Sequence, residues 1–427
     1  MKLYTRILVT MVSLAAAASA SAQPTEVPAA PEAPVAEPSA AAPVAAEASP
    51  GAPPAPAPAP VTEAPPSPGP APEAAAVAEA APAPPEAPAP TGEGDDGGDG
   101  GGALQIKVYG DANFSFDDQD GTDPTFSIGD VQLDAGGAIS DSVRMVTSTL
   151  LQLEGNDADV ELDIALLEWD VDDGFGLRLG RNRAMTGRYY RATPSRLAEL
   201  ATSSPVLASD EDDGGVLLAH QLGLEVFGGT STEGGLGLHY ALGISNGRGH
   251  STRAPSGNLD SNDFKAISVR LAALPGPEGL ELGVSGYADR IPAGLRDADG
   301  TVLIGEEIDE LVGAVHLAYI TDSVDLQGEL YYLYHEGRDS KADAQLVGGF
   351  LQAGVPVERF TPYGRLELMD RDVNDLFFNV SGIPFQVTDL RIGVGYRIAD
   401  GAVLKLEYGG ELETEVHGGT AQIAFGL

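Results

Sequence analysis

Hydrophobic and polar residues alternate with a period of two from residue 103 to the C-terminus. At the start of this region, Leu104, Ile106 and Val108 alternate with Gln105 and Lys107. Successive side chains of a β-strand point to opposite faces, so this period indicates strands with one apolar and one polar face. The same pattern returns in segments near residues 160, 236, 280, 390 and 404, and it predicts an all-β domain over residues 103–427.

Sixteen such strands can be placed along the domain, which is an even number. Their predicted starts lie near residues 104, 125, 142, 159, 175, 215, 235, 263, 279, 308, 323, 343, 362, 387, 402 and 417. Tight connections, such as those at Ser140 and Asp172, alternate with long ones, such as residues 184–213 and 246–262. Short turns at one end and long loops at the other are typical of a transmembrane antiparallel up-and-down β-barrel.

The first residues have the features of an export signal. Lys2 and Arg6 precede an apolar stretch, residues 7–18, and small residues then offer cleavage after Ala22 or two residues earlier. The apolar stretch is shorter than a membrane-spanning helix requires. We therefore predict that residues 1–22 are a signal peptide.

Residues 23–102 separate the signal peptide from the alternating domain. Up to Pro90 the segment consists almost wholly of Ala, Pro, Glu, Ser and Val, and residues 92–102 are rich in Gly and Asp. Such a composition buries too little apolar area to offset the entropy of the chain, and its prolines favour an extended conformation. We predict a disordered linker that lies in the periplasm.

The direction of the alternation is the physical argument for a membrane. Sixteen strands enclose more space than side chains can fill, so the interior is expected to be wet. The polar face would then line a lumen and the apolar face would meet lipid. The alternative is an elongated soluble β-sandwich or β-helix with the same alternation. The even strand count, the export signal and the unequal loops favour the barrel.

Composition narrows the function classes. The chain has 24 Lys and Arg against 64 Asp and Glu, so a nucleic-acid partner is not expected. It has no Cys and only six His, none in a metal-ligand or catalytic spacing, and neither a nucleophile elbow nor a P-loop occurs. We predict no enzyme, no cofactor and no metal site. A hydrolase that uses the inward-pointing His239 is the remaining enzymatic hypothesis.

Several segments resemble a known family. Residues 176–188 (GLRLGRNRAMTGR), 240–249 (YALGISNGRG), 269–287 (VRLAALPGPEGLELGVSGY) and 361–372 (TPYGRLELMDRD) resemble the phosphate-selective porins of the O and P type. This resemblance implies a trimeric sixteen-stranded porin in the bacterial outer membrane, in contact with lipid and lipopolysaccharide. It also implies that the third long loop, residues 184–213, folds into the lumen.

Positive charge is concentrated at this loop. The candidate constriction contains Arg178, Arg181, Arg183, Arg188, Arg191 and Arg196. The same loop then turns acidic, with Glu199, Asp210, Glu211, Asp212 and Asp213. Arginines at a constriction would attract solutes with carboxylates or phosphates. The arginines and the acidic residues of the loop could face each other across the pore. Alternatively, the arginines pair with these carboxylates and only hold the loop to the wall.

Local and overall charge predict opposite selectivity. The arginines favour anions, whereas the 52 acidic against 22 basic residues of the barrel domain favour cations. Alternation also turns Arg365, Arg391 and Arg397 inward as secondary pore-wall candidates.

The expected function is passive diffusion of small hydrophilic solutes or ions through a water-filled channel, with anion selectivity through the third loop as one possibility. The alternative is a plugged structural outer-membrane barrel whose leader tethers it to periplasmic partners, without transport.

Overall fold

The computed structural model describes residues 104–118, 123–154, 157–172, 174–192, 195, 197–208, 216–231, 236–248, 264–276, 278–296, 302–380 and 383–427. The chain divides into two units, residues 1–79 and 80–427, and the second unit contains the barrel. The predicted signal peptide and linker lie outside the described residues, as do Arg196, Asp210, Glu211, Asp212 and Asp213.

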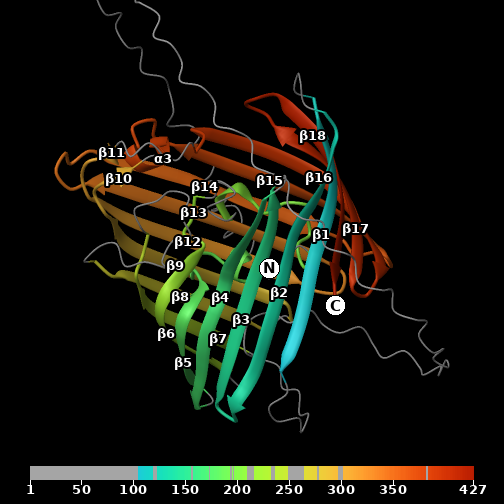
Figure 1. The fold of residues 1–427 in the computed structure, drawn as a ribbon, viewed down its shortest axis with the longest axis horizontal. Helices are drawn as coiled ribbons and strands as arrows, with labels where there is room; N and C mark the ends of the chain where they lie inside the picture. The colour runs from blue at the N-terminus through green and yellow to red at the C-terminus, as the bar shows by residue number, and fades with distance from the viewer. Residues whose placement is uncertain are drawn as a thin grey trace, which may run out of the picture. The chain divides into compact units, whose positions relative to one another are not determined.

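Sixteen antiparallel strands form a closed barrel (Figure 1). They are β1 (Gln105–Asp117), β2 (Thr125–Ser140), β3 (Val143–Glu154), β4 (Asp157–Asp172), β5 (Phe175–Arg183), β6 (His220–Ser231), β7 (Leu236–Ser245), β8 (Ala266–Pro275), β9 (Leu280–Ile291), β12 (Ile308–Ile320), β13 (Asp325–Gly337), β14 (Asp343–Gly354), β15 (Phe360–Arg371), β16 (Gln386–Ala399), β17 (Ala402–Glu411) and β18 (Val416–Gly426). Pairing of β1 with β18 closes the ring, so the sheet has no free edge. The predicted fold and strand number are confirmed.

The remaining elements lie in the long connections. The connection between β5 and β6, residues 184–219, is called L3 below and contains α2 (Tyr189–Ala192) and the 3-10 helix η1 (Val206–Ala208). The connection between β9 and β12 contains a small sheet of β10 (Leu295–Arg296) and β11 (Val302–Ile304). The connection between β15 and β16 contains α3 (Leu376–Val380). No helix in the described part of the chain is long and apolar enough to cross a membrane.

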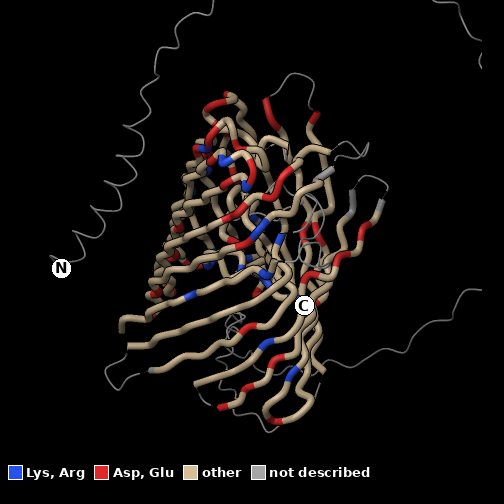
Figure 2. Tube along the Cα trace, turned by 90° about the vertical axis from the view of Figure 1, so that its left-hand side faces the viewer, with Lys and Arg blue, Asp and Glu red and all other residues tan. Residues whose placement is uncertain are grey.

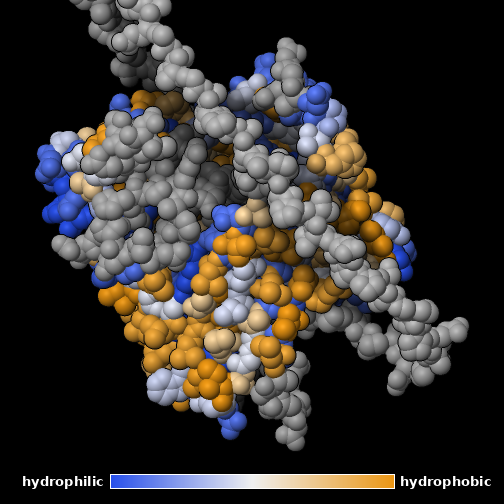
Figure 3. Space-filling model, viewed as in Figure 1, coloured by the Kyte–Doolittle hydropathy of each residue, from blue (hydrophilic) through white to orange (hydrophobic). Residues whose placement is uncertain are grey.

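The outer wall of the barrel is apolar. Along β7, Leu238, Leu242 and Ile244 are exposed. Ala241 and Ser245, which point to the other face of the strand, are buried. Figure 3 shows hydrophobic side chains gathered over the wall formed by β2 to β7. This outward apolar face confirms the predicted direction of the alternation.

The polar face of the strands was expected to line a wet lumen, but the interior is polar only in part. On the side of β9 to β16, inward side chains form a buried hydrophobic cluster with parts of three long connections. The cluster comprises Leu207, Val216, Leu217, Leu218, Ala266, Tyr287, Ile291, Ile304, Ile308, Val312, Ala314, Tyr331, Leu333, Leu346, Met369, Phe377, Phe378, Ile383 and Val387. The wall side chains alone are too small to occupy the interior of a sixteen-stranded barrel, and residues of the long connections occupy part of that space.

This cluster also explains an error in the strand prediction. A strand was expected from about residue 215, but residues 216–219 belong to L3, and β6 begins at His220. The apolar residues Val216, Leu217 and Leu218 pack into the hydrophobic cluster and do not extend the wall.

Asp375 fixes α3 against the barrel wall. Its carboxylate accepts hydrogen bonds from the backbone N–H groups of Phe377 and Phe378, both at 2.9 Å. Nδ1 of His335 on β13 lies 2.9 Å from the same carboxylate. Burial raises the pKa of the Asp375 carboxyl, but these hydrogen bonds and the charge of His335 lower it by more, so the pKa lies below its ordinary value.

Candidate channel constriction

L3 reaches from β5 to the opposite side of the barrel. β5 and β15 lie eight strands apart in either direction around the ring. L3 starts at the end of β5, and the Nη1 and Nη2 atoms of Arg365 on β15 donate to the backbone oxygen and Oγ of Ser203, at 2.5 and 3.1 Å. L3 therefore crosses the lumen, in the position that the family resemblance implies.

The first part of L3 is anchored to β9 and β13. Oε1 of Glu329 accepts the backbone N–H groups of Arg188 and Tyr189, at 2.7 and 2.6 Å. The Gly187 N–H donates to Oγ of Ser285 at 2.9 Å. Gly187 has a φ of 76°, and a Cβ there would collide with the Glu329 carboxylate, so this anchor requires glycine.

The second part of L3 is anchored to β15 to β18. Oγ1 of Thr202 donates to Glu407 at 2.7 Å, and its backbone oxygen accepts from Gln422 at 3.1 Å. Nζ of Lys405 donates to the backbone oxygen of Ala201 at 3.0 Å. Nη1 of Arg391 donates to Oγ of Ser203 at 2.9 Å. These contacts come from wall residues far from L3 in sequence.

The five described arginines of the candidate constriction each bond to a carboxylate of the barrel wall. The pairs are Arg178 with Glu168 and Glu225, Arg181 with Glu161, Arg183 with Asp163, Arg188 with Glu281, and Arg191 with Glu225. Figure 2 shows basic residues (blue) near the middle of the barrel, close to acidic residues (red). The positive charge of this group is therefore largely compensated within the wall.

Sequence reasoning missed these wall carboxylates as site residues. The expected partners were the acidic residues of L3 itself. Among these, the described Glu199 accepts a hydrogen bond from Ser204 at 2.7 Å. Glu161 and Asp163 lie on the polar face of their strand. The alternation of polar and apolar residues along this strand would have identified them as residues that face the lumen.

The three secondary pore-wall candidates differ in their surroundings. Arg365 is buried and bonds to both Ser203 of L3 and Glu367 of its own strand. Arg391 bonds to Asp389 and Glu407 as well as to L3. Arg397 is exposed near the end of β16 that leads into a short turn, and among the described residues no contact joins its side chain to L3. Two of the three therefore hold L3.

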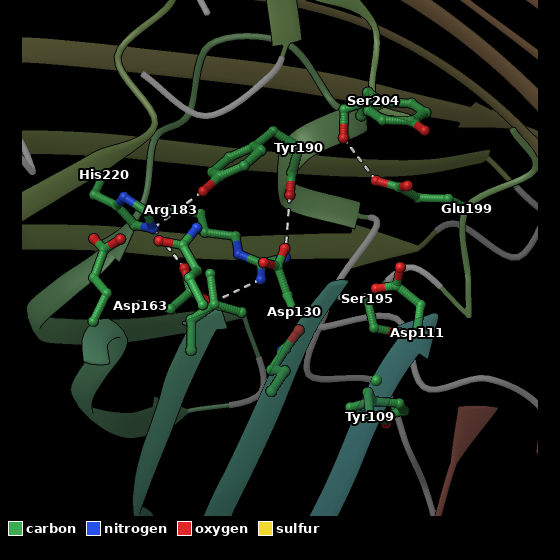
Figure 4. Close-up of a pocket in the computed structure, with 16 residues that line it drawn as sticks. Tyr109, Asp111, Asp130, Asp163, Arg183, Tyr190, Ser195, Glu199, Ser204 and His220 are labelled. Carbon is green, nitrogen blue, oxygen red and sulfur yellow. Dashed lines mark hydrogen bonds and ion pairs between the residues drawn. The ribbon is translucent and has the colours of Figure 1, made fainter. Parts of the chain in front are cut away.

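A pocket that is open to solvent lies between L3 and the wall formed by β1 to β6, and its empty volume of about 770 Å³ includes open solvent. It is lined by Tyr109, Gly110, Asp111, Asp130, Gln132, Leu150, Gln152, Glu161, Asp163, Arg183, Tyr189, Tyr190, Ser195, Glu199, Ser204 and His220. In Figure 4, Asp163, Arg183 and His220 lie together at one side, and Asp111 and Glu199 lie at the other. The hydrophobic cluster lies on the side of β9 to β16, so this pocket is off-centre.

One wall of the pocket is a tightly bonded group. Nε2 of His220 lies 2.5 Å from Asp163 and 3.2 Å from the Tyr190 hydroxyl. Nη2 of Arg183 donates to the same Asp163 at 2.8 Å, and Nη1 donates to the backbone oxygen of Tyr190 at 3.2 Å. These contacts hold α2 against β4 to β6 and leave the rest of the pocket open.

Solved structures with a similar fold are outer-membrane porins and channels. No protein-family model and no curated protein sequence matches the chain. The outer membrane protein OmpT of Vibrio cholerae, in a form lacking loop L8, matches with a TM-score of 0.54 and 13% identity over 77% of this chain and 100% of the other. An anion-selective porin from Comamonas acidovorans matches with a TM-score of 0.53 and 14% identity over 76% of this chain and 100% of the other.

A third similar structure is the outer membrane channel DcaP of Acinetobacter baumannii. It matches with a TM-score of 0.52 and 11% identity, over 77% of this chain and 98% of the other. At these identities the likeness shows the fold alone. The described barrel thus has the fold of sixteen-stranded outer-membrane porins.

Proposed function

We propose that this protein is an outer-membrane channel for the passive diffusion of small hydrophilic solutes or ions. The single observation that carries the proposal is the solvent-open pocket between L3 and β1 to β6, inside a barrel with an apolar outer wall. An apolar wall is stable against lipid, and a polar interior is stable only against water. No energy source or cofactor is needed for such transport.

The location and assembly are part of the same proposal. The export signal and the apolar wall favour insertion into the bacterial outer membrane, with lipid and lipopolysaccharide around the barrel and residues 23–102 in the periplasm. A homotrimer is consistent with the porin fold, and one similar structure, in-vitro folded OmpT of Vibrio cholerae, is described as a trimer form.

Among the arginines of the candidate constriction, Arg178, Arg181 and Arg183 lie on β5, and the two L3 arginines, Arg188 and Arg191, together with Arg183, which contacts Tyr190, are proposed to position L3. Five of them bond to wall carboxylates, so little uncompensated positive charge is left from this group to attract anions. Kinship with the phosphate-selective porins of the O and P type remains a proposal that rests on the sequence segments. The barrel domain has only four lysines, and phosphate preference is not part of the proposed function.

A plugged structural barrel is the second candidate. The hydrophobic cluster on the side of β9 to β16 favours it, because that part of the lumen is closed to water. The two candidates differ in one measurable property, which is the permeability of the purified protein.

Liposome swelling tests the proposed function. The purified protein is reconstituted into liposomes, which are then diluted into isotonic solutions of neutral sugars of increasing size. We expect rapid swelling with monosaccharides and slower swelling with trisaccharides, because L3 crosses the lumen and hinders larger solutes more. A variant without residues 23–102 should behave in the same way. Swelling no faster than that of protein-free liposomes would support the plugged barrel.

A further inference from the structure

Strand β14 lies on the side of the barrel opposite the pocket. It is eight strands from β4 in either direction around the ring, and Glu161 and Asp163 of β4 line the pocket. L3 lies between these two strands, because its residues Tyr189 and Glu199 line the same pocket and other side chains of L3 contact β14. The distance between L3 and β14 therefore affects how much of the lumen is left open on the side of β4.

Two inward glycines of β14 are covered by leucines of L3. The buried positions alternate along this strand and include Gly348 and Gly354. A Cβ on Gly354 would lie 2.9 and 3.0 Å from the two methyl carbons of Leu200, and a Cβ on Gly348 would lie 2.5 Å from a methyl carbon of Leu207. Carbon atoms in contact are normally about 3.5–4.0 Å apart. L3 thus lies closer to the strand backbone than side chains at these two positions would allow.

The L3 residues at these contacts adjoin the pocket. Leu200 directly follows Glu199, which lines the pocket. Tyr189, which also lines the pocket, packs edge-on against Phe350 of β14, with ring centres 5.3 Å apart. Among the described residues that line the pocket, neither glycine of β14 is present. An effect of these glycines on permeation must therefore pass through L3.

The hydrogen bonds of L3 hold it on this side of the barrel without fixing its distance from β14. Side chains of β15, β17 and β18 bond to residues 201–203 of L3. Hydrogen-bond lengths vary over about half an ångström at little cost. Overlap of packed carbon atoms, in contrast, forces side chains or backbone to move. The apolar contacts with β14 therefore set the distance.

We propose that the lack of a side chain at Gly354 and Gly348 sets the depth at which L3 lies in the barrel, and thereby the size limit of the passage beside it. The inference rests on the proposed function, because it names residues that determine which solutes the channel admits. A side chain at either position moves L3 toward β4 and narrows the pocket. Solutes close to the size limit are excluded first.

Gly354 provides the test. The three atoms nearest to a Cβ at this position all belong to side chains, whereas a Cβ on Gly348 would also lie 2.8 Å from the backbone oxygen of Leu368. The test variants are Gly354→Ala and Gly354→Val. A methyl carbon at this position requires Leu200 to move away by about 1 Å, and valine requires more.

Gly313→Val on β12 is the matched control. Gly313 lies between Leu311 and Val315, which are both exposed on the outward face, and a Cβ there would have no atom within 4 Å among the described residues. This variant adds the same side chain to a strand glycine of the barrel, but on the face that meets lipid and away from L3.

The measurement is liposome swelling with a monosaccharide and with a trisaccharide. We expect the ratio of the trisaccharide rate to the monosaccharide rate to fall from wild type to Gly354→Ala and further in Gly354→Val, and to be unchanged in Gly313→Val. An unchanged ratio in Gly354→Val, with barrel assembly verified by circular dichroism, would overturn this inference and leave the channel itself established. Wild-type protein that causes no swelling would overturn the proposed function and this inference with it.

A compensating variant separates an effect on L3 from an effect on the strand. Leu200→Ala removes the methyl groups that face Gly354, so in combination with Gly354→Val it should restore the ratio toward the wild-type value. A ratio as low as that of Gly354→Val alone would show that valine acts on the wall and would contradict the proposal.

Leu200→Phe adds volume to the same contact from the side of L3. It leaves the wall unchanged, so it keeps the proposal testable if Gly354→Val does not assemble into a barrel. We expect a lower ratio than in wild type. A wild-type ratio in Leu200→Phe would contradict the proposal.

Discussion

Oε1 of Glu329 on β13 lies 2.6 Å from the backbone nitrogen of Tyr189 in L3 and accepts its hydrogen. The same carboxylate also accepts the N–H of Arg188 and the hydroxyl of Tyr331. One wall side chain thus fixes the point where L3 turns across the lumen. The size of the pocket depends on this contact as well as on the strands that line it.

Removal of this anchor should loosen L3. In Glu329→Ala, two backbone donors of L3 lose their acceptor, and we expect a single-channel conductance that is larger or fluctuates between levels. L3 should also become more sensitive to protease in detergent. Glu336→Ala is the control, because Glu336 lies on the same strand but on its exposed side. Steady conductance in Glu329→Ala, equal to that of the control, would refute the anchoring role.

The buried ion pairs should matter for stability more than those on the surface. Glu225 bonds to both Arg178 and Arg191, and its removal leaves buried guanidiniums short of a partner. Loss of one member of a buried pair costs on the order of 3 kcal/mol. We therefore expect Glu225→Ala to unfold at clearly lower urea concentration.

Glu307→Ala serves as the matched control for that measurement. Glu307 pairs with Arg338 at the surface, where both side chains are more than 40% exposed. An exposed pair contributes about 1 kcal/mol or less. A similar loss of stability in both variants would contradict the assignment of Glu225 to a buried network.

The outward face of the strands should tolerate apolar residues only. Leu271 is exposed near the middle of β8, between Tyr240 on β7 and Val284 on β9. An arginine at the bilayer midplane costs roughly 2–4 kcal/mol, and the cost falls near the interface. We expect Leu271→Arg to lower the free energy of folding into lipid vesicles by that amount. Val355→Arg, in a short turn, should change it by much less.

Acid should weaken the attachment of α3. The folded-state pKa of Asp375 lies below its ordinary value, so its ionised form stabilises the fold above the unfolded pKa of about 3.9. This stabilisation is lost as the pH falls through the lowered folded pKa. We expect the unfolding temperature to fall as the pH drops below about 4, and to fall less in Asp375→Asn. Parallel pH profiles for the two proteins would be the contrary result.

Strand positions were predictable because an alternation of period two is a local property of the sequence. Leu104, Ile106 and Val108 already specify which face of β1 meets lipid. The crossing of the lumen by L3 was expected from its length and from the family resemblance. The strand ends next to L3 were less predictable, because the apolar run of residues 216–219 suits a buried loop as well as a strand.

The partners of the arginines could not be read from the sequence. Arg183 meets Asp163 because β4 and β5 pair in one particular register, and sequence alternation gives the face of a residue but not its cross-strand neighbour. Likewise, Glu407 meets Thr202 only after L3 has crossed the lumen. The hydrophobic cluster was missed for the same reason, since it joins inward residues of separate strands to three long connections.

The most direct measurement is the effect of thiol modification on single-channel conductance. Gln152→Cys lines the pocket beside L3, and Ser340→Cys, the control, lies exposed in the connection between β13 and β14. We expect a bulky thiol reagent to lower the conductance of the first variant in steps and to label the second without effect. Complete labelling of Gln152→Cys with unchanged conductance would show that solutes do not pass beside L3.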